Sequence, residues 1–190
     1  MNKLTESKFA ENAELIRQGN MQGLKAIYEE YAKMIYFSVL NLCGNSHTAE
    51  DVTSEFFLKL SSAVSVYRSG LGHKRWLLVS ARNLAIDFMR KQSREIPLEP
   101  SGGDEESHPL SDIPDDENTE ESVTSDLTVQ QLLSGLDENK REVVHLKLCC
   151  GLTFSEIGEV LHIPTATAAW RYSQGIAKLR KLYKEVCGDE

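Results

Sequence analysis

Residues 153–172 read TFSEIGEVLHIPTATAAWRY, and this stretch decides the fold of the C-terminal part of the chain. Thr153 and Glu156 form a capping box, in which each side chain accepts a hydrogen bond from a free backbone N–H at the start of a helix. That helix is short, because residues 162–164 predict a tight turn before a longer helix that runs to about Val186. A short capped helix, a turn and a longer helix are typical of a helix-turn-helix.

The second helix of such a motif fits the major groove of DNA and presents the side chains near its start to the base edges. The side chains predicted to face outward there are Thr165, Thr167, Trp170 and Arg171. Further along, the helix carries basic residues that can contact phosphates, which position a protein without reading sequence: Lys178, Arg180, Lys181 and Lys184. On the pattern alone, a plain pair of antiparallel helices with a solvated basic face stays an alternative.

The apolar residues on the N-terminal side of this motif also recur at helical spacing. Asp137 can cap a helix that ends at Gly151 and carries Val143, Val144, Leu146 and Leu148. A short helix before it, ending near Gly135, is indicated by Val129, Leu132 and Leu133. Residues 123–190 are therefore predicted to form a small all-helical domain.

Residues 96–122 separate this domain from the rest of the chain. They hold ten acidic residues, no Lys or Arg, and four of the five prolines. Their few apolar residues show no periodicity, so they cannot bury enough surface to offset the entropy lost on folding, and we expect a flexible acidic linker. The net charge of −8 belongs to this linker, because the remaining residues carry 19 acidic and 21 basic side chains. The overall acidity therefore does not argue against DNA binding by either domain.

Three long helices and a weaker one are predicted before the linker, in residues 1–95. One apolar stripe, ended by a glycine, comprises Leu24, Ile27, Tyr28, Tyr31, Ile35, Val39 and Leu42. Asn45 or Ser46 can cap the next helix, whose stripe is Val52, Phe56, Leu60 and Ala63. A third stripe follows a glycine-containing break and comprises Trp76, Leu77, Ala81, Leu84, Ala85 and Phe88. With the weaker helix around residues 7–18, the fold class is all-α, with two small helical domains.

The composition gives little support to several classes of function. No run of 18 apolar residues is present, and the first ten residues lack the apolar core of a signal peptide, so we expect a cytoplasmic protein with reduced cysteines. The chain has no Gly-rich phosphate loop, no His/Cys spacing typical of a metal site and no credible nucleophile–base set. These features argue against an enzyme, a cofactor or a small-molecule substrate. His145, Cys149 and Cys150 lie near one helical face, but a buried helix segment is favoured over a metal site.

Residues 136–148, LDENKREVVHLKL, and residues 151–161, GLTFSEIGEVL, resemble region 4 of the sigma-70 family. Residues 49–60, AEDVTSEFFLKL, resemble region 2.2 of the same family, and residues 75–91, RWLLVSARNLAIDFMRK, resemble regions 2.3 and 2.4. These ordered matches, with no room for a region 1.1 or a folded region 3, are typical of the extracytoplasmic-function (group 4) sigma factors. The resemblance implies a sigma factor that binds core RNA polymerase and directs promoter-specific transcription initiation, and that is a monomer when free.

The resemblance assigns region 2 to the β′ clamp of core polymerase and to the −10 promoter element. For the clamp, it implies a mixed acidic and aromatic patch of Asp51, Glu55, Phe56 and Lys59. Phe56 also fits the core of its own domain, as Trp76 does. For the −10 element, the loop at residues 67–74 and the following helix are expected to bind single-stranded bases through Arg68, His73, Lys74, Arg82, Asn83, Asp87 and Arg90. Asp87 also fits a structural ion pair with Arg90 or Lys91.

Region 4 is implied to bind the β flap and to read the −35 element through Thr165, Thr167, Trp170, Arg171 and Lys178. The start of the second helix departs from the family pattern, with Pro164 where a Ser cap is common, and this leaves the −35 sequence open. In related factors the linker threads the active-site cleft, where its acids would imitate nascent RNA. An anti-sigma factor is a further implied partner. The alternative function is a dimeric helix-turn-helix regulator that is independent of core polymerase.

Overall fold

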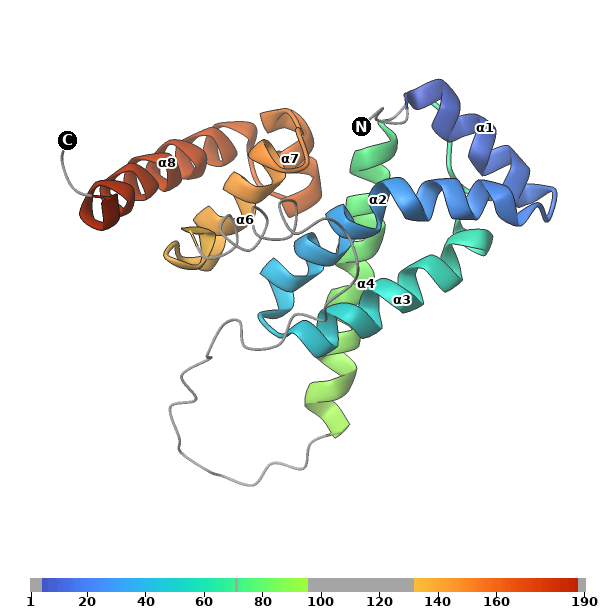
Figure 1. Cartoon of the computed structure of the whole chain (residues 1–190), viewed down its shortest axis with the longest axis horizontal. Coiled ribbons are helices and arrows are strands. Elements are labelled where there is room, and N and C mark those ends of the chain that lie inside the picture. The colour runs from blue at the N-terminus through green and yellow to red at the C-terminus, as the bar shows by residue number, and fades with distance from the viewer. Residues whose placement is uncertain (1–4, 71, 96–131, 188–190) are drawn as a thin grey trace. The chain divides into compact units, whose positions relative to one another are not determined.

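The computed structural model describes three stretches of the chain, residues 5–70, 72–95 and 132–187. Every regular element within these stretches is an α-helix, which confirms the all-α fold class for the described residues (Figure 1). The chain separates into two compact units, Met1–Ser107 and His108–Glu190. The predicted acidic linker, residues 96–122, lies outside the described residues, so its flexibility and the domain boundaries beside it stay predictions.

The first unit consists of α1 (Glu6–Arg17), α2 (Met21–Cys43), α3 (Ser46–Ala63) and α4 (His73–Glu95). Their apolar sides meet in one core, whose largest fully buried side chains are Tyr31, Phe9, Ile27, Ile35, Leu60, Leu77 and Leu78. The predicted stripes of α2, α3 and α4 supply most of this core, so helical periodicity identified them correctly. Tyr28, predicted on the α2 stripe, is instead exposed at its edge, with its ring 4.9 Å from that of Phe57.

Local capping explains where the helices of the first unit begin and end. Asn45 caps α3, because its side-chain oxygen accepts a hydrogen bond from the backbone N–H of Thr48 at 3.0 Å. Gly44 ends α2 in the left-handed conformation, with φ at 68°, which strains glycine little. Both features were predicted, and α1 confirms the weaker helix expected around residues 7–18.

The second unit consists of α6 (Glu138–Leu148), α7 (Phe154–Leu161) and α8 (Thr165–Cys187). Asp137 caps α6 by accepting a hydrogen bond from the Lys140 backbone N–H at 3.2 Å, as predicted. A small core joins α6 to α8 and contains Leu133, Leu136, Val144, Tyr172, Ile176 and Leu179. Leu148, which was predicted on the buried stripe of α6, is 58% exposed because the helix ends at this residue.

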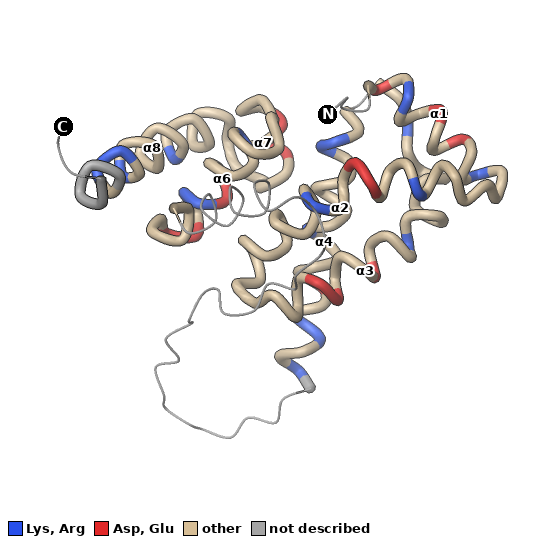
Figure 2. Tube along the Cα trace, viewed as in Figure 1, with Lys and Arg blue, Asp and Glu red and all other residues tan. Residues whose placement is uncertain are grey.

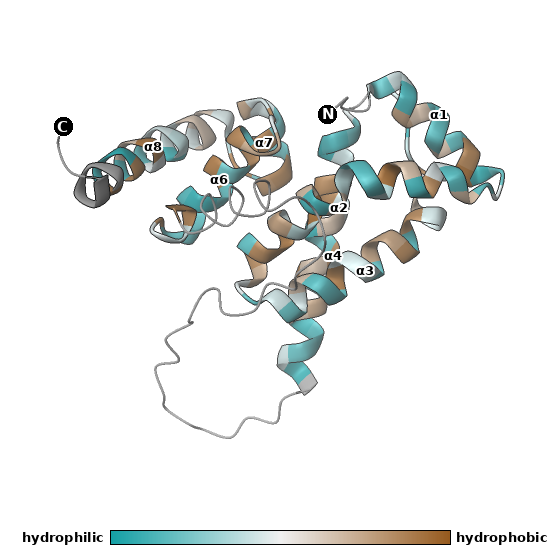
Figure 3. Ribbon diagram, viewed as in Figure 1, coloured by the Kyte–Doolittle hydropathy of each residue, from teal (hydrophilic) through white to brown (hydrophobic). Residues whose placement is uncertain are grey.

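Glycine allows α8 to approach α6 closely. A Cβ atom on Gly175 would lie 2.6 Å from Cγ2 of Val144, well inside van der Waals contact. Glycine in a helix interior costs about 1 kcal/mol relative to alanine, and here that cost is offset by the close packing. Figure 3 shows hydrophobic residues gathered where the helices of each unit meet. Across the part of the chain that the structure describes, no helix is both long and apolar enough to cross a membrane.

Candidate nucleic-acid and partner interfaces

The helix-turn-helix of the second unit is set by local hydrogen bonds at both ends of α7. The Thr153 N–H donates to Glu156 Oε2 at 2.8 Å and the Glu156 N–H donates to Thr153 Oγ1 at 3.3 Å, which confirms the predicted capping box. His162 ends α7 in the left-handed conformation, with φ at 54°. The Ile163 N–H then donates to the carbonyl of Gly158 at 2.9 Å. The predicted tight turn therefore forms, and it aims the start of α8.

Four of the five residues predicted to read the −35 element lie along the outer side of α8, and the fifth, Thr165, is its first residue. Thr165 and Lys178 are exposed, Trp170 is 60% exposed, and Thr167 and Arg171 are half-buried. Spacings of four and eleven residues place Thr167, Arg171 and Lys178 on one side of the helix. Ala168 is fully buried, so the inner side of α8 is anchored while this outer side stays open.

Aromatic packing fixes the angle between α7 and α8. The rings of Phe154 and Tyr172 meet edge to face with centroids 5.4 Å apart. The Lys147 ammonium lies 4.8 Å from the centroid of the Phe154 ring and donates a hydrogen bond to the Leu152 carbonyl at 3.0 Å. Sequence reasoning missed this support for α8, because the three side chains come from three different helices and no local spacing relates them.

The loop between α3 and α4, which was predicted to bind −10 bases, forms hydrogen bonds with a side chain of α1. The Glu6 carboxylate accepts hydrogen bonds from the Tyr67 hydroxyl at 2.5 Å and from the Gly70 N–H at 3.1 Å. It also accepts from the His73 backbone N–H at 3.0 Å and from His73 Nδ1 at 2.5 Å. Burial alone would raise the pKa of Glu6, but the hydrogen bonds from Tyr67 and the other donors lower it to about 2. Glu6 was not predicted as a site residue.

His73 was predicted to contact −10 DNA, but the structure gives it an internal position. It is 9% exposed, and its ring stacks on Phe9 with centroids 5.0 Å apart. Its Nε2 atom lies 2.7 Å from the Tyr31 hydroxyl, while Nδ1 contacts Glu6. Both ring nitrogens are therefore engaged within the protein, and the ring has little surface left for a base.

The other residues predicted for the −10 element remain near the surface. Arg68, Asn83, Asp87 and Arg90 are exposed, and Lys74 and Arg82 are half-buried. Asn83, Asp87 and Arg90 share one side of α4, since they follow one another at four and three residues. Arg90 Nη1 lies 3.7 Å from Asp87 Oδ1, which confirms the predicted structural pair. Trp76 packs against Tyr67, with ring centroids 5.2 Å apart, as its predicted core position requires.

The acidic residues predicted to bind the polymerase clamp, Asp51 and Glu55, are not among the buried residues of α3, and their side is called the outer side of that helix. Figure 2 shows acidic residues along α3. Asp51 is exposed, and Glu55 forms an ion pair with Lys59. Phe56 is only 4% exposed and belongs to the core of the unit, which was the alternative interpretation. Leu58 is 78% exposed and lies seven residues from Asp51, on the same side of the helix. Leu58 was not predicted, because an apolar residue in a helical pattern is usually assigned to the core.

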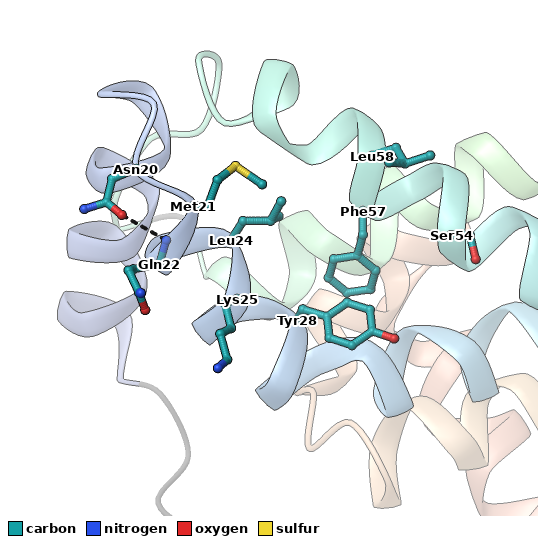
Figure 4. Close-up of a pocket in the computed structure, with 9 residues that line it drawn as sticks. All are labelled: Asn20, Met21, Gln22, Leu24, Lys25, Tyr28, Ser54, Phe57 and Leu58. Atoms are coloured by element: carbon teal, nitrogen blue, oxygen red, sulfur yellow. Dashed lines mark hydrogen bonds between the residues drawn. The ribbon is translucent and has the colours of Figure 1, made fainter. Parts of the chain in front are cut away.

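An apolar groove of about 640 Å³ lies between α2 and α3 (Figure 4). Its lining includes Met21, Tyr28, Phe57 and Leu58, and three of these, Met21, Tyr28 and Leu58, are more than half exposed. Contiguous exposed apolar side chains of this kind mark contact surfaces for other proteins. The groove adjoins the acidic side of α3, because Ser54 and Leu58 line it.

The three residues weighed as a metal site, His145, Cys149 and Cys150, do not converge. His145 is 2% exposed, and burial lowers the pKa of its imidazole to about 4. Cys150 is buried, whereas Cys149 is exposed. Among the described residues, no group of three or more His, Cys, Asp or Glu side chains is arranged to hold a metal ion.

Comparison with known families matches both units. The family profile described as Sigma-70 region 2 matches residues 27–95, and the profile described as Sigma-70, region 4 matches residues 132–181. The α1 helix lies before the first match.

Individual relatives extend the likeness over most of the chain. The ECF RNA polymerase sigma factor SigW of Bacillus subtilis is 30% identical to this chain. The match covers 90% of this chain and 94% of the SigW chain. SigE of Mycolicibacterium smegmatis is 29% identical and covers 86% of this chain and 62% of its own. SigM of Bacillus subtilis is 26% identical and covers 86% of this chain and 97% of its own.

The fold also occurs among solved structures. The structure of CnrH in complex with the cytosolic domain of CnrY has a TM-score of 0.60 to this chain at 17% identity. The match covers 92% of this chain and 96% of that chain. At this level of identity the likeness supports the all-helical fold alone.

Proposed function

The chain belongs to the sigma-70 family, as an extracytoplasmic-function RNA polymerase sigma factor, and we propose which described residues carry out its work. It binds core RNA polymerase and directs promoter-specific transcription initiation. The observation that carries the assignment is the ordered pair of region 2 and region 4 matches on two separate units. The factor acts by differential binding, and the polymerase supplies the chemical step.

The alternative function, a dimeric regulator that works without polymerase, is not favoured. It requires residues 1–95 to serve as a ligand-binding or dimerisation domain. The region 2 match covers residues 27–95, which is most of that stretch. The cytoplasmic location, the monomeric free state and the effect of the linker acids on promoter escape stay predictions.

For the polymerase clamp, the proposed surface is the outer side of α3. Asp51 and Glu55 supply negative charge that suits a basic partner, and electrostatic complementarity of this kind speeds association. Leu58 and the adjoining groove add apolar area, which supports a protein partner more than a nucleic acid. Lys59 contributes through its ion pair with Glu55, and the buried Phe56 supports the surface from beneath.

For the −10 element, the proposed surface combines the loop after α3 with the outer side of α4. The α4 helix carries six basic and two acidic residues, a balance that suits the phosphate backbone (Figure 2). Arg68, Lys74 and Arg82 supply positive charge, and Asn83 and Asp87 supply groups that hydrogen-bond to the edge of an unstacked base. Arg90 holds Asp87. His73 is left out of the DNA-contacting set.

For the −35 element, the proposed surface is the outer side of α8. Thr165, Thr167, Trp170 and Arg171 stand in the first two turns, where a recognition helix meets base edges. Lys178 lies two turns further on, where a phosphate contact would fix the orientation of the helix. The β flap and an anti-sigma factor, which the resemblance implies, complete the proposed partners.

Run-off transcription with purified core polymerase on a pool of genomic promoters tests the assignment. We expect initiation that depends on this chain, on promoters sharing a −35 and a −10 sequence. Three variants should fail differently: Asp51→Lys in core binding, Asn83→Ala in −10 preference and Trp170→Ala in −35 preference. Each DNA-contact loss should be about tenfold, since a lost specific contact costs about 1–3 kcal/mol.

Glu11→Lys is the matched control for Asp51→Lys, because Glu11 is an exposed acid on α1, away from α3. Stable dimeric operator binding without core polymerase would overturn the assignment. Equal loss of −10 and −35 preference in the Asn83 and Trp170 variants would overturn the proposed surfaces.

A further inference from the structure

The α1 helix lies before the region 2 match, yet it holds the loop that is proposed to read the −10 element. The match begins at residue 27, whereas α1 spans Glu6–Arg17. Residues at both ends of α1 bind the segment 64–73, which is more than 45 residues further along the chain. Two side chains of α1, Glu6 and Arg17, make seven hydrogen bonds to this segment. The contacts of Glu6, Arg17 and Phe9 make up this attachment of α1 to the loop.

Glu6, in the first turn of α1, binds the distal half of the segment. Its Oε1 atom accepts from the Tyr67 hydroxyl and the Gly70 N–H, and Oε2 accepts twice from His73. A carboxylate without its proton is an acceptor only, so all four donors are matched. Donors that point at a carboxylate favour its ionised form, and they hold the pKa of Glu6 well below its ordinary value.

Arg17, in the last turn of α1, binds the proximal half. Its Nη2 atom donates to the Val64 carbonyl at 2.7 Å and to the Tyr67 carbonyl at 2.9 Å, and Nε donates to the Val64 carbonyl at 3.2 Å. Val64 is the C-cap of α3, where free carbonyls carry partial negative charge. The guanidinium therefore fixes the point at which the chain leaves α3 and enters the loop.

Aromatic packing completes the attachment and decides which residues of the loop face outward. Phe9 of α1 is fully buried, and its ring centroid lies 4.9 Å from that of Tyr67 and 5.0 Å from that of His73. Tyr67 and His73 are thus the two buried anchors of the loop. Between them, Arg68, Ser69 and Gly70 are exposed. Gly70, with φ at 90°, adopts a conformation that other residues rarely take.

We propose that Glu6 is a positioning residue for −10 recognition, because its carboxylate holds the loop in the shape that receives an unstacked base. The proposal rests on the proposed function of this loop. A glycine-containing loop that is free in solution must lose conformational entropy when it captures a base. Four hydrogen bonds to one carboxylate remove that cost before DNA binds, although Glu6 itself does not contact the DNA.

The test is a Glu6→Gln holoenzyme assayed on promoters changed one base at a time in the −10 and −35 elements. An amide places one NH₂ group where the carboxylate accepted two hydrogen bonds, so at least two of the four donors lose their acceptor. We expect the preference for the native −10 bases to fall about fivefold to tenfold. The preference at −35 and the affinity for core polymerase should not change. Fluorescence of 2-aminopurine in the −10 strand should report slower base capture.

Glu11→Gln is the matched control, since it makes the same chemical change on an exposed side chain of the same helix. Tyr67→Phe removes one of the four donors and keeps the ring, so it should show a smaller loss in the same direction, even if Glu6→Gln folds poorly. A fall in −10 and −35 preference by the same factor would overturn the proposal, because it would indicate general destabilisation. Unchanged −10 preference in both variants would also overturn it.

A separate pair of variants distinguishes this proposal from the assignment of the loop itself. Arg68→Ala and Lys74→Ala remove the charges that the loop is proposed to offer to DNA. If they leave the affinity of the holoenzyme for −10 DNA intact, the proposed function of the loop fails. If they reduce this affinity while Glu6→Gln leaves −10 preference unchanged, the loop keeps its function and the positioning role of Glu6 fails.

Discussion

The two units present their proposed DNA-reading elements in opposite ways. In the first unit a loop is held by side chains of a helix that is distant in sequence, chiefly Glu6 and Arg17. In the second unit a helix, α8, is held by apolar packing and by a capped turn before it. A loop has no shape of its own and needs tertiary hydrogen bonds to acquire one, whereas a helix keeps its shape and needs only its direction set.

The same contrast appears in one ionisable group of each unit, the partly exposed Glu6 and the buried His145. Glu6 is surrounded by hydrogen-bond donors that lower its pKa to about 2, so the first unit favours its charged form. His145 is surrounded by the core of the second unit, and burial lowers its pKa to about 4, so the second unit favours the neutral form. Hydrogen bonding dominates at one site and desolvation at the other.

Acidification should therefore destabilise the second unit first, and this is the largest effect that we expect. The unfolded chain protonates His145 near its ordinary pKa of 6.5, while the folded unit resists protonation down to about 4. The unfolding free energy of the second unit is therefore highest above pH 6.5, and it decreases by about 3 kcal/mol as the pH falls from 6.5 to 4. The contribution of Glu6 is intact above its ordinary pKa of 4.5 and is lost only as pH falls from there towards 2. Urea unfolding of the full chain at pH 7 and pH 5, followed by NMR signals of each unit, measures the difference.

The glutamine side chain in the His145→Gln variant cannot take up a proton. We therefore expect the unfolding free energy of the second unit to depend much less on pH between pH 6.5 and 4 in this variant. The control is His162→Asn, which removes an exposed histidine of the same unit and suits the left-handed conformation there. A second unit whose unfolding free energy is constant over this range would contradict the contrast.

The turn of the helix-turn-helix should be the next most sensitive feature, because it sets the direction of α8 together with the apolar packing. A Cβ atom on Gly158 would lie 2.7 Å from the backbone carbonyl oxygen of Ile163, so Gly158→Ala must shift the turn. We expect a loss of about 2 kcal/mol of unfolding free energy in the second unit, and weaker −35 recognition with −10 recognition retained. Promoter assays of the holoenzyme, with urea unfolding of the free chain, measure both.

Gly135→Ala is the matched control, since the closest atom to a Cβ there would be the flexible end of Leu182, at 2.7 Å, and the Leu132 carbonyl oxygen would lie at an ordinary contact distance of 3.5 Å. If both glycine variants shift −35 recognition equally, the turn does not direct α8 and the contrast between the units is weakened.

Helix caps should give the smallest effect, and an equal one in both units. Thr153→Ala removes the hydroxyl that caps α7, and Asn45→Ala removes the side chain that caps α3. Each should lower the unfolding free energy of its own unit by about 1 kcal/mol. Thermal unfolding monitored by NMR checks this, with Ser155→Ala, an exposed neighbour that is not the cap, as control. If the loss caused by removing a cap is far larger in one unit, the two units differ in their local hydrogen bonds and not in their tertiary ones.

Features of the site that depend on neighbours in the sequence were predicted well. The capping box at Thr153, the cap at Asn45 and the tight turn before α8 all formed as expected. Each of these is closed by hydrogen bonds that span only a few residues, so the local sequence contains both partners. The outward position of Trp170 follows from helical periodicity in the same way, because it lies two residues after the buried Ala168, on the opposite side of α8.

Features that depend on distant partners were not predictable. His73 has a residue type that suits a surface contact, yet the structure buries it. Leu58 has a residue type that suits a core, yet it is exposed beside an apolar groove. Glu6 lies 61 residues from Tyr67, and its carboxylate accepts a hydrogen bond from the Tyr67 hydroxyl. No periodicity of 3.6 residues encodes such a pair, since it depends on how the helices pack.

The sequence by itself determined the two helical units, their helix ends and the sigma-70 resemblance, because spacing, caps and motif order are local properties of the chain. Only the tertiary structure decided which residues of those motifs reach solvent and what shapes the loop between α3 and α4. The physical reason is that burial and long-range hydrogen bonds arise when helices pack against one another. In that packing, a carboxylate at the start of α1 becomes the acceptor for a loop more than 60 residues away.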